Sequence, residues 1–324
     1  MRVLSGVQPS GKLHVGNWFG AIRQFLHLQQ TPGNECFYFI ADLHAMNSVH
    51  DGNELRANSL LLATDFLALG LDPQPSVLYR QSDVPEVTEL TWMLSTVTPM
   101  GLLQRGHSYK DKTARGQVAN HGLFAYPVLM AADILIVHAD QVPVGKDQKQ
   151  HLEMTRDMAT AFNQTYGPIL RLPEPMILPE VAVVPGLDGQ KMSKSYGNTI
   201  EIFAPEGELK KKIMSMATDS TPVAEPKPTD GSALYDLLKL CTPAGEWAET
   251  ERKFTEGGTG YGDLKKLLLA RMLDTFSIAR ARRAKLENDQ AYVKQILVQG
   301  RERAREVIGR VLGECRSACG MGWQ

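Results

Sequence analysis

Short apolar segments alternate with amphipathic helical patterns through the first part of the chain, and this alternation limits the folds open to it. Residues 1–7 (MRVLSGV), 36–42 (CFYFIAD) and 76–81 (SVLYRQ) read as buried strands. Helical patterns of about ten residues or more lie between them, at 16–28 and 54–69. Strands joined by helices of this length predict an α/β fold with a parallel sheet and crossover helices.

Two further segments bear on the same sheet. The run 131–139 (AADILIVHA) fits a helix that passes directly into a strand, and the periodicity leaves both readings open. The run 181–184 (VAVV) predicts one more strand.

After Ile202 the pattern changes to long helices. Helical patterns cover 206–218, 231–241, 260–289 and 291–318, and the proline-rich link TPVAEPKPTDG separates the first two. The sequence therefore predicts an α/β domain over residues 1–202 and an all-helical C-terminal domain over residues 203–324.

Charge is distributed unevenly along the chain. From Glu251 to the end, 15 Lys and Arg face 9 Asp and Glu, a net charge of +6 in a chain whose total is −1. This basic tail indicates either a polyanionic partner or a solvated helix face with an excess of Lys and Arg, and the residues alone slightly favour the second. Residues 280–283 (RARR) are the predicted basic patch.

Composition excludes several classes of protein. With 43% hydrophobic and 22% charged residues, the chain resembles ordinary globular proteins rather than disordered ones. Its longest apolar runs are short and contain Asp65 and Asp133, and the first residues are too short an apolar stretch for a signal peptide, so no membrane association is expected. Four cysteines form no disulfide framework, which favours a reducing cytoplasm. Cys315 and Cys319 are more simply small residues on one helix face than a metal site.

The turn after the first segment, QPSGKLHVGNWFG (8–20), is a possible anion site. In a parallel sheet, the N–H groups at the start of a helix that follows a strand point outward and attract anions. Gly16 would let a ligand approach the backbone, and His14 and Asn17 add polar groups. The turn matches neither the Walker A nor the G-x-G-x-x-G pattern, and Gly and Ser are also common in ordinary turns.

A second possible anion site is KMSKS (191–195), which has glycines on both sides. Its lysines fit either a solvated surface loop or a flexible device that closes on a phosphate group. The five residues do not decide between these readings.

The two segments together resemble the signature motifs of class I aminoacyl-tRNA synthetases. The KMSKS element is intact, whereas the first motif, His14-Val-Gly-Asn17, has Asn in its last position where the family pattern has His. Residues 122–159 (GLFAYPVLMAADILIVHADQVPVGKDQKQHLEMTRDMA) are similar to the tryptophanyl branch, as are LSGVQPSGKLHVGNWFGAI and ADLHAMN. The resemblance covers most of the chain, is strongest up to Asn198, and implies a Rossmann-like nucleotide-binding domain followed by a helical anticodon-binding domain.

The resemblance implies that Asp133 reads the indole N–H of tryptophan. Indole has one donor and no acceptor, so a fixed carboxylate suits it. Without the resemblance, Asp133 would be an internally paired acid, His44 a structural histidine and Met130 plain core. The other tryptophan-binding residues that the resemblance implies are Gly6, His44, Tyr126, Met130, Val142, Val144 and Gln148.

For ATP, the resemblance implies contacts from the first turn, from VGKDQ and from the KMSKS loop. Lys191 and Lys194 are the expected catalytic residues, because they would stabilise charge on the leaving pyrophosphate. Lys112 is an expected triphosphate contact, and an exposed surface lysine is the alternative. The full ATP-binding set is Gln8, Pro9, Ser10, Gly16, Asn17, Lys112, Gly145, Lys146, Asp147, Val183, Lys191, Met192, Ser193, Lys194 and Ser195.

Three positions depart from the family pattern. Tyr196-Gly197-Asn198 stands where many relatives have an acidic residue, Lys146 replaces an acidic residue, and Leu4 replaces an aromatic one. These departures affect the tuning of ATP binding more than the reaction.

The expected activity is therefore ATP-dependent ligation of tryptophan to tRNA(Trp) through an adenylate, with Mg-ATP as substrate and no protein-bound structural metal. The nucleophile is a carboxylate, so no general base is needed for the first step. The alternatives are a tyrosyl-tRNA synthetase, a non-catalytic RNA-binding paralogue, and a nucleotidyltransferase that does not act on tRNA. The resemblance also implies a homodimer, and neither a membrane nor DNA is an expected partner.

Overall fold

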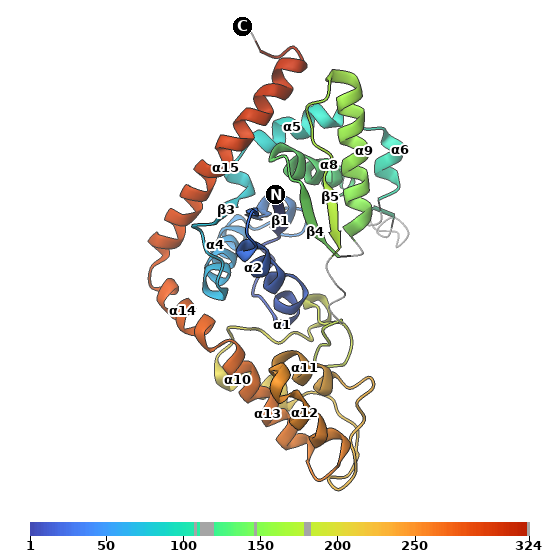
Figure 1. Ribbon diagram of the computed structural model, residues 1–324, viewed down its shortest axis with the longest axis vertical. Helices are drawn as coiled ribbons and strands as arrows, with labels where there is room; N and C mark the ends of the chain where they lie inside the picture. The colour runs from blue at the N-terminus through green and yellow to red at the C-terminus, as the bar shows by residue number, and fades with distance from the viewer. Residues whose placement is uncertain (107–108, 111–119, 146–147, 178–182, 323–324) are drawn as a thin grey trace.

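The computed structural model of the protein describes residues 1–106, 109–110, 120–145, 148–177 and 183–322. Its centre is a parallel sheet of five strands in the order β3-β2-β1-β4-β5 (Figure 1). The strands are β1 (Arg2–Val7), β2 (Glu35–Ile40), β3 (Ser76–Arg80), β4 (Gln141–Val144) and β5 (Glu174–Ile177). This order confirms the predicted α/β class, and it places a change of winding direction between β1 and β4.

Helices cover both faces of the sheet because successive strand residues point to opposite sides. Tyr38 and Ile40 of β2 belong to one hydrophobic cluster with α2 and α4, whereas Phe37 and Phe39 belong to another with α5, α8 and α9. The helices of this part are α1 (Val15–Asn17), a π turn (η1, Trp18–Ile22), α2 (Arg23–Gln30), α3 (Asp42–Ala45), α4 (Gly52–Leu69), a 3-10 turn (η2, Gln81–Asp83), α5 (Glu86–Ser95), α6 (Met100–Gln104), α8 (His121–Ile136) and α9 (Lys149–Tyr166).

Two strand predictions differ from the structure. The segment 131–139 is helical up to Ile136, and the strand follows only at β4. Of the expected strand 181–184, residues 181–182 lie outside the described residues, and Val183 and Val184 are not in a strand. The fifth strand is instead β5, a segment with Pro175; a strand at the sheet edge tolerates proline because one side of it needs no hydrogen-bond partner.

Beyond Ile202 every regular element of the described chain is a helix. These helices are α10 (Glu206–Met214), α11 (Ala233–Cys241), α12 (Ala244–Thr255), α13 (Tyr261–Thr275), α14 (Ser277–Glu287) and α15 (Gln290–Ala318). The pattern expected as one helix over 260–289 is divided at Phe276, whose backbone (φ −105°, ψ 8°) leaves the helical region. The boundary at residues 202 and 203 remains a prediction.

The last helix returns to the sheet. In Figure 1, α10–α13 form a group below the sheet, while α14 and α15 run back along its β3 side. Gly300 of α15 lies against the backbone of Leu78, so close that a Cβ atom there would be 1.8 Å from the Leu78 oxygen. Arg303 donates to the carbonyl oxygens of Pro73 (2.7 Å) and Ser76 (2.9 Å). These contacts fix α15 along strand β3.

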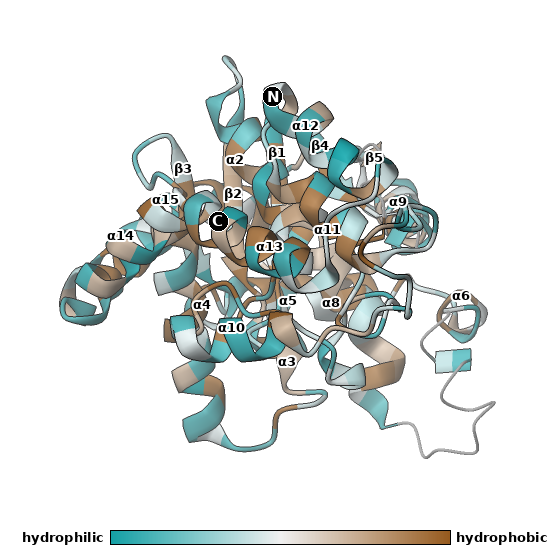
Figure 2. Cartoon of the chain, turned by 90° about the horizontal axis from the view of Figure 1, so that it is seen from below, coloured by the Kyte–Doolittle hydropathy of each residue, from teal (hydrophilic) through white to brown (hydrophobic). Residues whose placement is uncertain are grey.

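Hydrophobic segments lie mostly in the interior of the view in Figure 2, and hydrophilic ones at its periphery. No helix in the described part of the chain has the length and apolar character needed to cross a membrane.

Candidate active site

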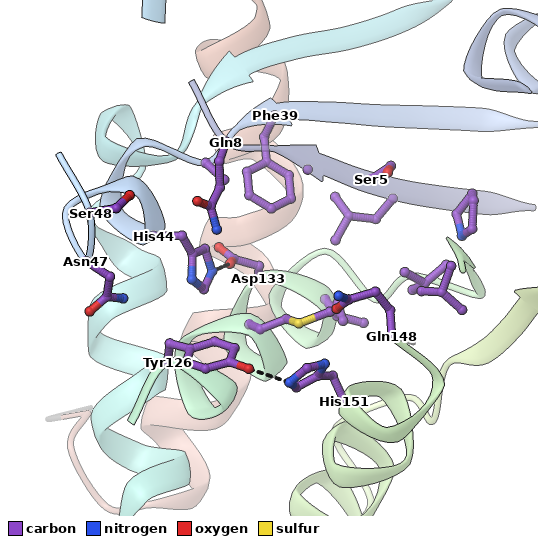
Figure 3. Close-up of a pocket in the computed structure, with 18 of the residues that line it drawn as sticks. Ser5, Gln8, Phe39, His44, Asn47, Ser48, Tyr126, Asp133, Gln148 and His151 are labelled. Atoms are coloured by element: carbon purple, nitrogen blue, oxygen red, sulfur yellow. Dashed lines mark hydrogen bonds and ion pairs between the residues drawn. The ribbon is translucent and has the colours of Figure 1, made fainter. Parts of the chain in front are cut away.

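A pocket of about 670 Å³ opens where β1 and β4 end, at the change of winding direction (Figure 3). Ligands bind at this position in open parallel sheets, because the neighbouring connections leave the sheet on opposite faces. All the residues that were expected to bind tryptophan line this pocket, together with Gln8: Gly6, His44, Tyr126, Met130, Asp133, Val142, Val144 and Gln148.

Asp133 is the buried acid of the pocket, and only 3% of its surface is exposed. His44 Nε2 lies 2.9 Å from Asp133 Oδ2, and Gln81 Nε2 donates to both carboxylate oxygens at 2.9 and 2.8 Å. Burial raises the pKa of Asp133, and the hydrogen bonds from His44 and Gln81 oppose this rise. Two carboxylate oxygens have about four acceptor sites, so the group can still accept a hydrogen bond from a ligand.

Gln81 is a site residue that the sequence analysis missed. It is fully buried at the start of the η2 turn after β3, and its Oε1 accepts from the N–H groups of Leu43 (3.1 Å) and His44 (3.4 Å). One amide therefore connects the His44 segment to Asp133. A polar residue directly after a buried strand was the available signal, because strand ends meet at the ligand edge of a parallel sheet.

His151 is a second missed residue. Its ring lies next to Tyr126, and the Tyr126 hydroxyl and His151 Nε2 form a hydrogen bond (Figure 3). His151 follows Gln148 by three positions at the start of α9, so both side chains lie on one helix face. That spacing could have identified it.

The first turn and α1 form the neighbouring surface. His14 precedes α1, and its N–H donates to Asn17 Oδ1 (3.0 Å), which caps the helix. Burial, and then the positive charge of Lys194, lower the pKa of His14 to about 4, although Glu201 raises it. At neutral pH the imidazole is therefore uncharged.

The KMSKS loop lies on this first turn. Lys194 Nζ donates to Ser10 O (3.0 Å) and to Ser10 Oγ (3.3 Å), and burial lowers the Lys194 pKa. Met192 is buried, and its sulfur accepts from the Gly16 N–H at 3.3 Å. A side chain at Gly16 would meet His14 Nδ1 at 2.9 Å and Met192 Cβ at 3.3 Å, so glycine permits this contact. Two segments far apart in the sequence thus meet at the first turn, whose Gln8 lines the pocket.

The other residues expected to bind ATP have varied positions. Pro9 is buried and Gln8 exposed within the first turn, Gly145 is exposed at the end of β4, and Val183 is 63% exposed. Lys191 and Ser195 are exposed in the loop, where Ser195 Oγ lies 2.8 Å from Ser193 Oγ. Lys112, Lys146 and Asp147 lie outside the described residues.

The predicted basic patch at 280–283 is largely engaged inside the protein. Arg280 donates to Ile202 O and Ala204 O, both at 2.7 Å, and Arg283 Nε donates to the buried Asp65 at 2.6 Å. Arg280 and Arg283 therefore tie α14 to Ile202, Ala204 and helix α4, and RNA binding by residues 280–283 stays a prediction. Among the described residues, no group of three or more His, Cys, Asp or Glu side chains is arranged to hold a metal ion.

Comparison with known proteins gives a consistent result. The family described as tRNA synthetases class I (W and Y) matches residues 1–277. The tryptophan–tRNA ligase of Fusobacterium nucleatum subsp. nucleatum is 51% identical over 321 residues, which cover 99% of this chain and 98% of that protein. The tryptophan–tRNA ligase of Campylobacter jejuni (strain RM1221) is 50% identical over 307 residues, 95% of this chain and 96% of that one.

Solved structures agree. The tryptophanyl-tRNA synthetase of Campylobacter jejuni in complex with ADP and tryptophan has a TM-score of 0.93 at 48% identity, covering 99% of this chain and 100% of that chain. The tyrosyl-tRNA synthetase of Archaeoglobus fulgidus has a TM-score of 0.65 at 23% identity, with 87% and 90% covered, which is a likeness of fold alone.

Proposed function

The chain belongs to the class I tRNA synthetases of the tryptophan and tyrosine type, and from that premise we propose how its residues serve the ATP-dependent ligation of L-tryptophan to tRNA(Trp). The observation that carries the proposal is the placement of a buried acid, Asp133, in a pocket that Gln8 of the first turn also lines, while Lys194 is held on the same turn at Ser10. This arrangement would put an amino acid side chain and a nucleotide phosphate side by side.

Tryptophan would enter the pocket with its indole N–H toward Asp133. Val142 and Val144 from β4 and Met130 from α8 would pack on the ring, and Tyr126 would close the far side. His44 and Gln81 hold the carboxylate in place, so it would not need to reorganise when the ligand arrives. Gly6 and Gln148 complete the proposed set of tryptophan contacts. Gln8, which also lines the pocket, would lie near the carboxylate of the bound tryptophan.

ATP would bind as its Mg²⁺ complex across the first turn. The phosphate oxygens would lie near Gly16 and Asn17 at the start of α1. The Gly16 N–H donates to the Met192 sulfur at 3.3 Å in this structure, so a phosphate oxygen that accepts from it would replace that contact. Lys191 and Lys194 would place ammonium groups against the leaving pyrophosphate. The adenosine contacts from Gly145, Lys146, Asp147 and Val183, and a triphosphate contact from Lys112, remain predictions.

In the first step, a carboxylate oxygen of tryptophan attacks the α-phosphorus of ATP. The bond from that phosphorus to the bridging oxygen breaks, and pyrophosphate leaves with the electron pair. In the second step, the oxygen of a ribose hydroxyl on the terminal tRNA adenosine attacks the acyl carbon and gives up its proton. The bond from that carbon to the phosphate oxygen breaks, and AMP leaves with the electron pair. Since the first nucleophile is already an anion, positioning and charge stabilisation are sufficient for it.

The expected alternatives are not favoured. A tyrosine enzyme shares the fold, but the relatives at about half identity are tryptophan–tRNA ligases. A non-catalytic paralogue would have no use for both loop lysines, of which Lys194 reaches the first turn. A nucleotidyltransferase without tRNA would leave the basic C-terminal helices unexplained.

We propose that tRNA binds along the helical region and that the protein is a cytoplasmic homodimer. Arg282, Lys285 and Arg310 are exposed there and can contact phosphates. Trp92 of α5 and Met100 of α6 are 71% and 61% exposed, which is unusual for large apolar side chains. Both helices pack on α8, which carries Asp133, so a dimer contact there would adjoin the pocket.

The test is ATP–pyrophosphate exchange with each amino acid in turn. We expect exchange with tryptophan alone. Asp133→Asn should weaken tryptophan binding about 10- to 100-fold, since a hydrogen bond to a charged group contributes about 1.5–3 kcal/mol. Lys194→Ala should slow exchange by about two orders of magnitude without changing the affinity for tryptophan.

Matched controls separate these effects from loss of folding. Asp140→Asn removes an acid at the opposite end of β4, and Lys210→Ala removes an exposed lysine on α10. Both controls should behave as wild type. Exchange with tyrosine instead of tryptophan, or no exchange with any amino acid, would refute the proposed function.

A further inference from the structure

The KMSKS loop has a folded stem. Met192 N donates to Val184 O (2.9 Å), Gly186 N donates to Gln190 O (2.7 Å), and Pro185 and Lys191 form an antiparallel bridge. After this hairpin, residues Lys194–Tyr196 form one 3-10 turn (η4), which ends at Gly197 with φ 66°. The backbone pairs of this stem join residues 184–186 to residues 190–192. They do not hold residues 193–197, which follow the stem.

Asn198 closes the loop from its other end. Its Nδ2 donates to Asp188 Oδ1 (2.8 Å) and to Lys191 O (3.1 Å), while its Oδ1 accepts from Ser193 N (2.8 Å). Its own carbonyl oxygen accepts from Leu187 N at 3.0 Å. Only 3% of this polar residue is exposed, and both the oxygen and the nitrogen of its side-chain amide are engaged inside the loop.

The contacts of Asn198 surround Met192. The Lys191 carbonyl and the Ser193 N–H lie on either side of Met192 in the chain, and one amide holds both. Met192 in turn is buried against Gly16 on the first turn. The Asn198 side chain therefore fixes the two peptide planes that flank Met192, the first of which begins at Lys191 and the second of which ends at Ser193, one residue before Lys194.

Asn198 is held by its surroundings as well. A Cβ atom at Gly186 would lie 2.3 Å from the Asn198 amide, so the absence of a side chain at 186 leaves the space that this amide fills. The hydrogen bond from Asn198 is the main cause of the lowered pKa of Asp188. An acid at position 198 would lose both donors and face a second carboxylate.

We propose that Asn198 is a positioning residue, which fixes the KMSKS loop so that its lysines meet the triphosphate during adenylate formation. This inference rests on the proposed function, because it assigns Asn198 to the step in which Lys191 and Lys194 act. Asn198 acts through the loop and does not itself contact substrate.

The test compares Asn198→Asp and Asn198→Ala with Asn163→Ala. Asn163 is a matched control, because its side chain likewise makes three hydrogen bonds to a loop, at Ile169 and Leu170, near the opposite end of the sheet. For each protein, kcat and the separate KM values for ATP and tryptophan are measured by pyrophosphate exchange, together with the melting temperature.

The Asn198 variants should lower kcat/KM for ATP by about ten-fold or more, because buried donors and acceptors lose their partners. The KM for tryptophan should change by less than about two-fold, which is less than the loss of one hydrogen bond to tryptophan would cause. Asn163→Ala should lower the melting temperature and leave both KM values unchanged. Wild-type ATP parameters in the Asn198 variants, or an equal ATP effect in Asn163→Ala, would overturn the inference.

A second arm reports on the loop without catalysis. Trypsin cleaves after Lys191 and Lys194, and mass spectrometry of brief digests gives the rate at each. Cleavage there should be faster in Asn198→Ala than in wild type and unchanged in Asn163→Ala. Equal loop cleavage in wild type and Asn198→Ala would overturn the inference. Absence of tryptophan-dependent exchange in the wild-type protein would instead refute the proposed function, and this second arm would still decide whether Asn198 fixes the loop.

An exchange of partners tests the pairing itself. In the double variant Asn198→Asp with Asp188→Asn, the amide at 188 can donate to the carboxylate at 198. The double variant should recover part of the ATP affinity that Asn198→Asp loses. No recovery would contradict the assigned bond between the two side chains.

Discussion

The Asp133 carboxylate is held by His44 and by Gln81. Its orientation therefore depends in part on Gln81, a residue that is not proposed to contact the ligand. Gln81 donates to both oxygens of Asp133 while it accepts from the backbone that precedes His44. A buried carboxylate that loses a donor must find another partner or change its position.

We expect Gln81→Met to raise the tryptophan dissociation constant about ten-fold, because the hydrogen bonds to the charged group are lost while the volume is retained. Equilibrium binding of tryptophan measures this. Gln29→Met is the matched control: Gln29 is also buried, and it binds Gly70, Asp72 and Ser76 near the amino end of β3. A Gln81 variant with wild-type affinity would show that Asp133 keeps its orientation without the amide.

His14 links the stability of the protein to pH. Its pKa is lowered from 6.5 to about 4, so the unfolded chain binds more protons than the folded one between these values. The uncharged His14 therefore leaves the folded state fully stable above about pH 6.5. The free energy of unfolding decreases as pH falls from there toward 4. Against His14→Gln, wild type should lose about 2–3 kcal/mol more between pH 7 and pH 4.5 in urea unfolding.

Gln24→Ala on helix α2 provides the comparison, since it removes no titratable group and should follow the wild-type pH profile. Parallel profiles for wild type and His14→Gln would contradict the argument.

Much of the site could be predicted from single residues. Asp133 and His44 were found, because an acid inside an apolar run and a motif match both mark a sequence position. Gln81 and His151 were not, because their roles depend on which strands and helices are neighbours in space. Asn198 was noted only as a departure from a pattern, whereas the structure gives it four hydrogen bonds within the loop.

At the scale of elements, helix α15 lies directly against strand β3 at Gly300, whose backbone meets that of Leu78. Gly300→Ala would place a methyl carbon against the Leu78 carbonyl oxygen, and backbone on both sides leaves little room to adjust. We expect a loss of about 1–3 kcal/mol or more in the free energy of unfolding. Gly309→Ala and Gly313→Ala on the same helix meet nothing within 4 Å and should instead stabilise it, by about 0.5–1 kcal/mol.

Urea unfolding of the three variants measures these differences. A Gly300 variant as stable as the Gly309 variant would show that α15 can move away from β3 without loss.

Strands β1, β2 and β3 and the helices at 16–28 and 54–69 could be predicted because local sequence decides them, whereas α5, α9 and β4 were not predicted. The run CFYFI is apolar and buried on both faces of the sheet, and the helix over 54–69 ends at a left-handed glycine, Gly70. The prediction failed for β5, since EPMI contains a proline and is a strand only through its pairing with β4. Helix α12 was missed as well. No Gly or Pro marks the break at Phe276, whose ring packs edge-on against Trp18.

At the scale of the whole molecule, the exposed Trp92 offers a test of the proposed dimer. Trp92→Glu would place a charge in an apolar contact, and we expect the protein to become a monomer in sedimentation experiments while its melting temperature stays near that of the isolated wild-type subunit. Leu172→Glu changes another exposed apolar residue and should leave the assembly intact. A Trp92 variant with wild-type mass would move the interface elsewhere.

Strand β3 forms one border of the sheet, and the helix that covers it, α15, is separated from it by most of the chain. A ribosome therefore makes β3 long before it makes the segment that will shield it. Until then, the nascent protein presents an uncovered strand border that could pair with a neighbouring chain. Aggregation during production should consequently depend on how quickly translation passes from the sheet to α15, even for variants whose finished form is fully stable.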